Sequence, residues 1–416
     1  MRSLKSRKCP ALLLAGIFCI GCLTVERSNP IDSDPGVFAA KRPSLLLPLG
    51  REQWYAGTRH LVSWLPGDRD QTPVISLQLS LDDGQTFNHT IAEDISNSGN
   101  LDWLVPDLPS KMCRIRVAFA DSGITGPGKF AILRKPVPVQ RTLNGGEWPS
   151  WRNERLAFMS DRAGDYDIYV RSGSTLIRVT SNNSFDGYPS FDSKGFHLAF
   201  TSNRTGRNEI WATEQFFTRN SLGPVQLTHG GGTYPAWRQQ PRARRLVFIS
   251  TSPGFNGNPV QNLSTVIFTN DLDASLNITD VRLRADSGSK ERPIWVEPSG
   301  QQFIYYKQPG SSPNTIRRIR IDDVSEDLPP EAIVLPFGPE TNVRNLTISA
   351  SSSRAAMNIN GDIWVLTMRD GEIINDPLQI TFHAADDDVP DWRGDTQLAF
   401  QSNRTGRWEI WTVEMP

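Results

Sequence analysis

One segment of this chain occurs twice, almost unchanged, two hundred residues apart. Leu198–Trp211 reads LAFTSNRTGRNEIW and Leu398–Trp411 reads LAFQSNRTGRWEIW, and Leu156–Tyr169 (LAFMSDRAGDYDIY) is a third copy. A repeat constrains the fold strongly, because every copy has to form the same supersecondary unit and pack against its neighbours. We therefore expect one repeat array from about residue 138 to the end of the sequence.

Each copy is built from short β-forming runs. A Pro-x-aromatic element such as Tyr188–Phe191 (YPSF) comes first, and two apolar runs separated by a Gly-containing turn follow. The copy ends in a short strand that closes on Thr, as in Pro224–Thr228 (PVQLT). Short apolar runs between Gly, Pro and Asn indicate strands and hairpins. No stretch of helical period competes with this interpretation.

Counting these units predicts an all-β ring. The second strand of each unit is anchored at one of six positions: Leu156, Leu198, Leu246, Phe303, Ala355 and Leu398. Six units of four strands, about 40–45 residues each where compact, are typical of a β-propeller. The sixth unit reaches only its third strand before Pro416, and Pro138–Thr142 (PVQRT) matches Pro224–Thr228. We expect residues 138–142 to supply the missing strand and close the ring, which removes exposed edges.

The repeat resembles that of TolB-like six-bladed β-propellers, P-x-W-S-P-D-G…I-A-F-x-S-x-R-x-G…I-Y, over residues 138–416. The resemblance implies a fold and leaves the activity open. Prolyl-oligopeptidase-type enzymes with similar blades carry a hydrolase domain with a G-x-S-x-G motif, which is absent here. Oligogalacturonate lyases use a histidine cluster, whereas the five histidines here are scattered singly. We therefore predict no catalytic residues and no histidine-based metal site.

The N-terminus has the pattern of an export signal. Residues 1–21 combine four basic residues with the apolar run Ala11–Ile20, which is too short to span a bilayer. The end Cys19-Ile20-Gly21-Cys22 resembles a bacterial lipobox, although Cys19 stands where Leu is usual. The resemblance implies lipidation of Cys22 and an anchor in the outer membrane; an ordinary secretory signal is the alternative. Residues 22–43 then form a flexible tether.

Residues 44–134 are expected to form a separate β-sandwich. Six β-rich runs alternate with turns: His60–Trp64, Val74–Leu81, Phe87–Ala92, Leu101–Val105, Met112–Ala120 and Lys129–Leu133. Ile75, Leu77, Leu79 and Leu81 alternate with period two, which places one apolar face toward a core. The segment resembles Ser/Thr-rich Ig-like domains of surface proteins. Ser80–Phe87 also resembles the Asp-box of sialidases, which is a turn stabiliser and is expected to be structural here.

Composition excludes some functions. Removing residues 1–21 takes away four basic residues and leaves 40 Lys/Arg against 45 Asp/Glu, a net charge of −5. No Lys/Arg block is present, so we expect no nucleic-acid binding. After processing only Cys22 and Cys113 remain of the four cysteines, and Cys113 is expected to be a buried free thiol without a disulfide framework. A monomer without a resident cofactor is the simplest expectation.

The candidate site lies at one end of the propeller channel. Residues just before each innermost strand should ring the channel mouth, and five of them are acidic: Glu147, Asp186, Glu291, Asp387 and Asp388. Converging carboxylates suit Ca²⁺ or a basic peptide; the alternative is that they cap turns or are solvated. The hairpins between second and third strands share this face, with Arg207, Arg407, Trp408 and the insertion Pro253–Leu263 as further candidates.

Three other arginines of these hairpins have a simpler interpretation. The pairs Arg162–Asp167, Arg204–Glu209 and Arg404–Glu409 share one spacing, which predicts an ion pair inside each hairpin and leaves Arg207 and Arg407 freer. We expect a non-catalytic cell-envelope lipoprotein that binds an envelope protein or peptide through this face. The alternative is a propeller that binds or cleaves envelope polysaccharide, which exposed aromatic side chains and a close carboxylate pair would favour.

Overall fold

The chain divides into two compact units between Ile132 and Leu133. The computed structural model describes residues 43–120, 122–214, 223–238, 244–253, 259–268, 281–283, 290–308, 316–321, 331–337 and 341–416. The predicted signal peptide, Cys22 and almost all of the tether lie outside these residues. No helix in the described ranges has the length and apolar character needed to cross a membrane.

The first unit contains two antiparallel sheets. The smaller has the order β1 (Ser44–Leu47), β3 (Arg59–Leu65), β6 (Asn100–Leu104). The larger has the order β2 (Gln53–Tyr55), β9 (Phe130–Leu133), β7 (Ser110–Phe119), β4 (Val74–Ser80), β5 (His89–Ser96), and β8 (Ser122–Thr125) also pairs with β7. The six predicted strands are confirmed. The short strands β1, β2 and β8 were missed, because three or four residues give little periodicity.

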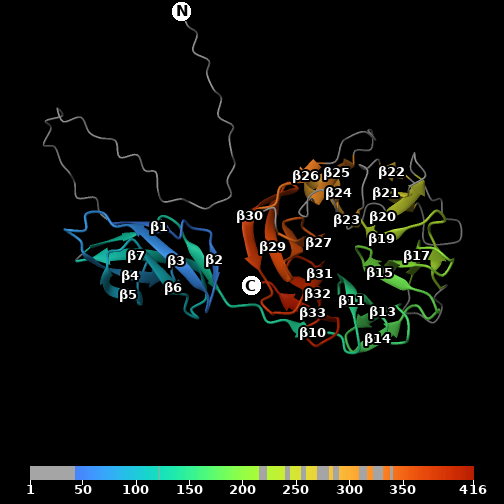
Figure 1. Cartoon of the computed structure of the whole chain (residues 1–416), viewed down its shortest axis with the longest axis horizontal. Coiled ribbons are helices and arrows are strands. Elements are labelled where there is room, and N and C mark those ends of the chain that lie inside the picture. The colour runs from blue at the N-terminus through green and yellow to red at the C-terminus, as the bar shows by residue number, and fades with distance from the viewer. Residues whose placement is uncertain are drawn as a thin grey trace, which may run out of the picture. The chain divides into compact units, whose positions relative to one another are not determined.

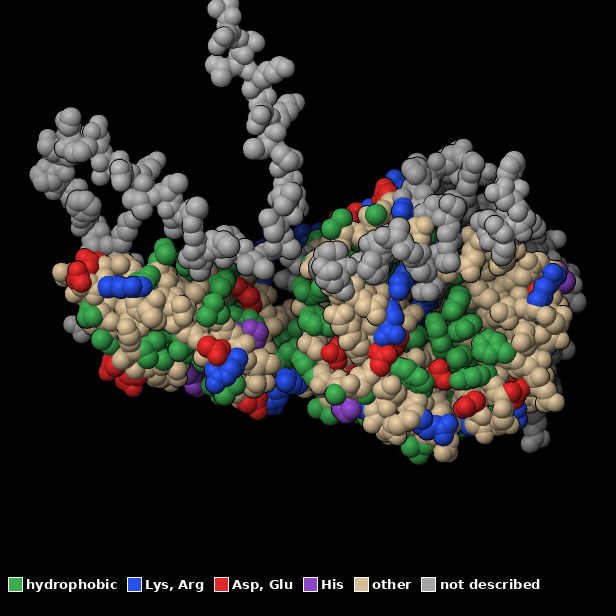
Figure 2. Space-filling model, in the orientation of Figure 1, with side chains coloured by type: hydrophobic (Ala, Val, Ile, Leu, Met, Phe, Trp, Pro, Cys, Tyr) green, Lys and Arg blue, Asp and Glu red, His purple; other side chains and the backbone are tan. Residues whose placement is uncertain are grey.

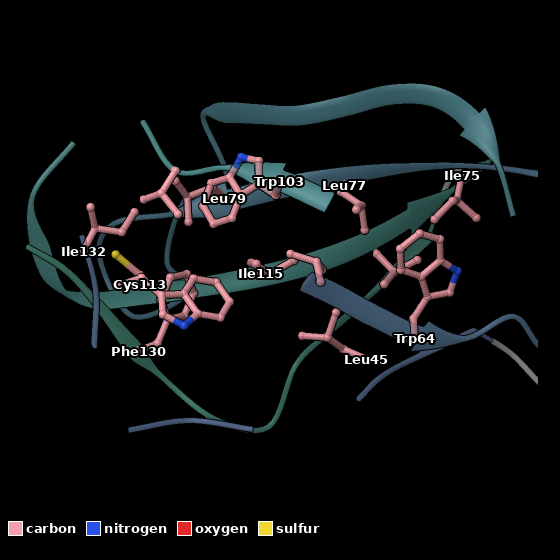
Figure 3. Close-up of a cluster of buried hydrophobic side chains, with 14 residues drawn as sticks. Leu45, Trp64, Ile75, Leu77, Leu79, Trp103, Cys113, Ile115, Phe130 and Ile132 are labelled. Carbon is pink, nitrogen blue, oxygen red and sulfur yellow. The ribbon is translucent and has the colours of Figure 1, made fainter. Parts of the chain in front are cut away.

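The two sheets share one apolar core, shown in Figure 3. Ile75, Leu77 and Leu79 point into it from alternate positions of β4, as the period-two pattern predicts. Cys113 is a buried free cysteine in the same core, and burial raises the pKa of its thiol. Its predicted role as a buried thiol is therefore confirmed.

The turn that resembles an Asp-box is held together by hydrogen bonds among its own residues. Asp82 Oδ1 accepts hydrogen bonds from Ser80 Oγ at 2.6 Å and from Thr86 N at 2.9 Å, and Asp82 Oδ2 accepts one from Thr86 Oγ1 at 2.7 Å. These bonds, led by that from Ser80, lower the pKa of Asp82 to about 2. The geometry confirms the structural interpretation of this segment.

The second unit is a six-bladed propeller in which each blade is a four-stranded antiparallel sheet (Figure 1). The first three blades, from inner to outer strand, are β11 (Glu147–Arg152), β12 (Arg155–Ser160), β13 (Asp167–Ser172), β14 (Thr175–Arg178); β15 (Asp186–Phe191), β16 (His197–Ser202), β17 (Glu209–Glu214), β18 (Val225–Gln226); and β19 (Thr233–Trp237), β20 (Arg244–Pro253), β21 (Pro259–Phe268), β22 (Val281–Leu283).

The other three blades follow the same order. They are β23 (Glu291–Val296), β24 (Gln302–Lys307), β25 (Ile316–Ile321), β26 (Glu331–Ile333); β27 (Val343–Ile348), β28 (Arg354–Ile359), β29 (Asp362–Arg369), β30 (Glu372–Gln379); and β31 (Asp387–Arg393), β32 (Gln397–Ser402), β33 (Glu409–Glu414), β10 (Val139–Gln140). A short 3-10 turn, η1 (Pro298–Gly300), joins β23 to β24.

Apolar clusters fill the spaces between neighbouring blades. Ala157 and Met159 of the first blade pack with Phe200 of the second, while Phe158 of the first blade packs with Ala399 of the sixth. The second strands are therefore buried on both faces, which explains why they read as continuous apolar runs such as LAF. Exposing either face would cost about 25 cal/mol for each Å² of apolar surface.

The strand that closes the ring comes from upstream of the first blade. Val139 pairs with Thr412 and Gln140 with Trp411, and Arg141 N donates to Ile410 O at 2.7 Å. The predicted closure by residues 138–142 is confirmed. A β-strand added at this position covers the otherwise open edge of β33.

A buried threonine and an acidic residue reinforce the closure. Thr142 Oγ1 donates to Glu409 Oε2 at 2.6 Å and accepts a hydrogen bond from Ile410 N at 2.8 Å. Equivalent pairs occur in three more blades: Thr180 with Asp167, Thr228 with Glu209 and Thr381 with Asp362. In these four blades the Thr after the outer strand and the acid at the start of the third strand therefore recur because they bond to each other.

The insertion predicted at Pro253–Leu263 is for the most part a longer hairpin. β20 and β21 each have ten residues, and their ladder extends from Arg244–Phe268 to Pro253–Pro259. The hairpin's tip, residues 254–258, lies outside the described residues. The prediction that this insertion is the least repeat-like hairpin is confirmed by these long strands, of which Pro253 and Pro259 are the last described pair.

Candidate functional site at the channel mouth

One residue of every innermost strand adopts a left-handed backbone conformation. The φ angles are 51° for Trp148, 54° for Tyr188, 54° for Tyr234, 43° for Arg292, 51° for Asn345 and 49° for Val389. Each of these residues stands at the irregularity in the pairing of the first and second strands, and five of them precede a proline. Positive φ is uncommon for residues with a side chain, so the surrounding structure has to hold it.

Side chains of the neighbouring blade help to hold this conformation. Trp148 N donates to Gln401 Oε1 at 2.9 Å, and Tyr234 N donates to Thr201 Oγ1 at 3.2 Å. These bonds link the innermost strand of one blade to the second strand of the blade before it. The six residues form what we call the channel ring.

Half of the channel ring is aromatic. The ring centroids of Tyr188 and Tyr234 are 4.3 Å apart, and those of Trp148 and Tyr188 are 4.7 Å apart. Phe185 lies 5.5 Å from Tyr188, and Tyr166 lies 5.9 Å from Phe185. These five side chains, all partly exposed, form a continuous aromatic patch that extends from the hairpin and loop residues inward to the channel.

A glycine makes this packing fit. A Cβ added at Gly187 would lie 2.4 Å from the ring of Phe185 and 3.0 Å from the sulfur of Met159. A residue with a side chain at position 187 would therefore clash with Phe185, which packs directly against the backbone of β15.

Figure 2 shows the chemical contrast on one face of the propeller. Hydrophobic side chains gather there over the inner strands β11, β15 and β19, and charged side chains of both signs lie beside them over β27 and β31. This division follows the sequence of the channel ring, because the first three blades supply Trp or Tyr and the last three supply Arg, Asn and Val.

The interior of the channel is small. A cavity of about 70 Å³ is lined by Trp148, Tyr188 and Tyr234 on one side and by Arg292 and Asp391 on the other. That volume accommodates a few water molecules. Arg292 reaches across it, with its guanidinium 5.8 Å from the Trp148 ring and its Nη2 donating to Pro390 O at 2.7 Å. Burial lowers the pKa of Arg292, and nearby Asp391 and Asp388 oppose that shift.

Two of the predicted partner-binding carboxylates are buried ion-pair residues. Asp186 and Asp387 are both fully buried. Asp186 Oδ1 pairs with Arg204 at 2.9 Å, and Asp387 Oδ2 pairs with Arg404 at 2.8 Å. The prediction that these aspartates meet a partner was wrong, because each one pairs with an arginine in the hairpin between the second and third strands of the same blade.

The predicted ion pairs within the hairpins were wrong for the same reason. Arg204 and Arg404 bind the innermost strand, so the acids of the third strands take other partners. Arg178 pairs with Asp167, Arg207 Nε donates to Glu209 at 2.6 Å, and Glu409 pairs with Arg407 at 4.0 Å in addition to Thr142. Sequence spacing identified residues on one hairpin and missed the strand that lies beside it.

The remaining carboxylates differ from one another. Asp388 is buried, pairs with Arg344 at 3.2 Å and accepts from Asn345 Nδ2 at 2.9 Å, so it is also a poor candidate for a partner contact. Glu147 is partly exposed and accepts a hydrogen bond from Tyr166 Oη at 2.8 Å. The side chain of Glu291 lies outside what the structure describes.

The carboxylates do not assemble a metal site in the described part of the chain. Within those residues no group of three or more His, Cys, Asp or Glu side chains is placed to hold a metal ion. Arginines neutralise Asp186, Asp387 and Asp388, which removes the converging negative charge that the Ca²⁺ prediction needed.

The predicted basic candidates are on the surface but are not free. Side-chain exposure is 62% for Arg207 and 50% for Arg407. Arg207 also donates to His229 O, and Arg407 lies 3.6 Å from Asp161. Trp408, the aromatic candidate beside Arg407, is partly exposed. The expectation that the two arginines lack partners was wrong, although their guanidinium groups remain accessible.

Sequence reasoning missed the aromatic patch. It treated Trp148, Tyr188 and Tyr234 as repeat positions, although each stands three residues before the aromatic residue of its element that enters the core. The sequence contained one indication of this site. The residue directly before Pro varies between the five units that have this Pro, and is Trp, Tyr, Tyr, Arg and Val in turn.

No protein-family model matches the chain, and no curated protein matches it. Solved structures do resemble it. A protein of unknown function from Bacteroides thetaiotaomicron is 12% identical, with 92% of this chain and 99% of that chain covered and a TM-score of 0.45. TolB from Acinetobacter baumannii is 16% identical, covering 78% of this chain and 67% of that one, with a TM-score of 0.42.

A third similar structure is an enzyme. Trypanosoma rangeli sialidase, solved with sialic acid, is 10% identical over 68% of this chain and 57% of its own, with a TM-score of 0.44. Proteins with and without an enzymatic name are thus among the neighbours of this all-β, propeller-containing chain, and identities this low transfer no activity.

Proposed function

We propose that this chain is a non-catalytic, lipid-anchored protein of the cell envelope that binds a protein partner through the mouth face of its propeller. The aromatic patch of Tyr166, Phe185, Trp148, Tyr188 and Tyr234 is the observation that carries the proposal. Tyr and Trp dominate the energetic centres of protein interfaces, together with Arg. A contiguous, partly exposed group of such rings at one site supports an interaction surface.

The surroundings of the patch fit the usual anatomy of an interface. The exposed guanidinium groups of Arg207 and Arg407 supply a polar rim, while the cavity behind the patch is too small for a ligand of ordinary size. A partner would therefore meet the patch from the mouth side. Rim charges of this kind act mainly on the association rate and its salt dependence.

Site-specific crosslinking tests this proposal. A photo-crosslinking amino acid at Arg407 should capture one defined envelope protein in cells, because this position borders the patch. The same amino acid at Lys194, an exposed residue in the turn at the opposite end of the inner strands, should capture none. Equal capture from both positions, or none from Arg407, would contradict the proposal.

Anchoring is tested separately. Acyl chains on Cys22 supply membrane affinity of about 0.8 kcal/mol per buried methylene. Cys22→Ala should leave the protein unprocessed or soluble, as measured by fractionation and labelling with a fatty-acid analogue. Normal maturation and membrane recovery of that variant would overturn the lipoprotein assignment.

Envelope polysaccharide is a second candidate ligand, since the partly exposed aromatics that would favour it are present. Binding of neutral oligosaccharides that is lost with Tyr188→Ala would favour this candidate over a protein partner. Turnover of a glycan by the purified chain would establish an enzyme instead.

A further inference from the structure

Glu147 differs from the acids at related positions of the mouth. Asp388 occupies the same position in the sixth blade, opposite Gln401, and is neutralised by Arg344. Glu147 stands opposite Met159, and among the described residues its side chain has one hydrogen-bond partner, the hydroxyl of Tyr166. It is a partly buried carboxylate without a cationic partner there.

The first blade lacks the acid that fixes the hairpin arginine elsewhere. Gly146 stands in the place that Asp186 and Asp387 occupy in the second and sixth blades. Arg162 therefore donates to Gly145 O and to Ser160 Oγ, the latter at 2.9 Å. Its guanidinium is held by a carbonyl and a hydroxyl, and no ion pair between it and Glu147 is present.

Electrostatics make this position receptive to a cation. Burial raises the pKa of Glu147, the hydrogen bond from Tyr166 partly opposes this, and nearby Asp161 adds to it. A positive group beside the carboxylate would relieve both the lost solvation and the repulsion from Asp161.

The aromatic patch begins at the same place. Trp148 is the next residue, and Tyr166, which binds Glu147, is the outermost ring of the patch. Aromatic faces attract Lys and Arg cations. The chain itself already places one guanidinium, that of Arg292, near the Trp148 ring.

We infer that the mouth accepts a Lys or Arg side chain of the protein partner, which pairs with Glu147 and lies against Tyr166 and Trp148. This inference rests on the proposed function, and it names the chemistry of the group that the partner inserts. A basic side chain bound at Glu147 would also account for the location of the aromatic patch, which lies beside a carboxylate rather than within a purely apolar surface.

Short peptides test the inference on the purified full chain. The probes are N-acetylated tripeptide amides with the sequences Gly-Arg-Gly, Gly-Lys-Gly, Gly-Glu-Gly and Gly-Ala-Gly, and binding is measured by calorimetry. The two basic peptides should bind weakly and the other two should not. Glu147→Gln should weaken the binding of the basic peptides by about tenfold or more, because a charged partner becomes neutral while the carboxamide oxygen still accepts from Tyr166.

Glu154→Gln is the matched control. Glu154 is a 77% exposed acid at the other end of β11, where it pairs with Arg393. This variant should bind the basic peptides as the unchanged chain does, and thermal unfolding should show that both variants are folded. Unchanged binding by Glu147→Gln, or equal binding of the acidic peptide, would overturn the inference.

The crosslinking experiment separates this inference from the proposed function. If Arg407 captures a partner and Glu147→Gln does not reduce that capture, the mouth binds a protein without the basic side chain and the inference is wrong. If Arg407 captures nothing, the proposed function itself fails.

Discussion

The blade frame and the channel ring obey different rules although both recur around the same axis. In the frame, the side chains recur: a buried Thr–acid pair joins the outer and third strands in four blades, and large apolar residues fill each space between blades. In the channel ring, the backbone recurs, with φ between 43° and 54°, while the side chain changes from Trp to Val. Side chains that recur between blades therefore indicate packing contacts. Side chains that vary while the backbone conformation recurs indicate the candidate site.

The two regions differ because their residues contact different kinds of neighbours. An apolar frame residue contacts the next blade, so the same space has to be filled at each interface. A channel-ring residue faces its counterparts across the axis and the mouth, where no repeated partner dictates its identity. Sequence variation is tolerated there and is available for function.

The largest effect should come from removing the closing strand. Deletion of residues 138–143 from the full chain removes the β10 ladder and leaves Glu409 without Thr142. The sixth blade should lose protection, because β33 becomes an open edge and the buried Glu409 carboxylate loses one of its hydrogen-bond donors, Thr142. Hydrogen exchange measured by mass spectrometry reports β31–β33 separately from the sandwich. Retained protection of β33 would show that the closure contributes little.

The next effect separates a buried hairpin arginine from an exposed one, each paired with a buried carboxylate. Arg404→Ala leaves the fully buried Asp387 unpaired and should destabilise the propeller by about 3–5 kcal/mol. Arg207→Ala removes a mostly exposed guanidinium from the buried Glu209, which keeps hydrogen bonds from Thr228 and Gly231, so the cost should be smaller, about 1 kcal/mol. Denaturant unfolding of both variants measures the difference. Equal costs would mean that the hairpin arginines do not divide into structural and accessible classes.

Two tryptophans test the frame against the channel ring directly. Trp392 is 2% exposed between the fifth and sixth blades, so Trp392→Ala should cost about 3–5 kcal/mol. Trp148 is partly exposed in the channel ring. Trp148→Ala should cost about half as much or less, because folding removes less of the apolar surface of this side chain from water. Trp148→Ala should nevertheless abolish partner capture at Arg407, which Trp392→Phe should preserve.

The smallest effect belongs to the Asp82 turn of the sandwich. The folded pKa of Asp82, about 2, lies below its unfolded value near 3.8. Its contribution to stability is therefore present above about pH 4 and is lost as the pH falls through about 2. Asp82→Asn should flatten this part of the acid-unfolding curve of the sandwich and leave the propeller unchanged. A curve identical to that of the unchanged chain would show that the turn is indifferent to its charge.

The sequence by itself determined the fold of this protein, since a repeat has to form the same unit each time. Six blades, the closing strand at residues 138–142, the buried Cys113 and the structural turn at Asp82 could all be predicted, because each depends on neighbours along the chain or on pairing between copies.

Only the tertiary structure decided which polar residues are free to act. Asp186, Asp387 and Asp388 were predicted to be accessible and are neutralised by arginines from elsewhere in the fold. Arg204 and Arg404 lie in hairpin turns of the same blades, and Arg344 lies in the innermost strand of the fifth blade. The patch around Tyr188 joins residues of three blades that are far apart in sequence. Spacing along one hairpin cannot indicate such contacts, because the packing around the axis determines which side chains meet and which charges remain unpaired.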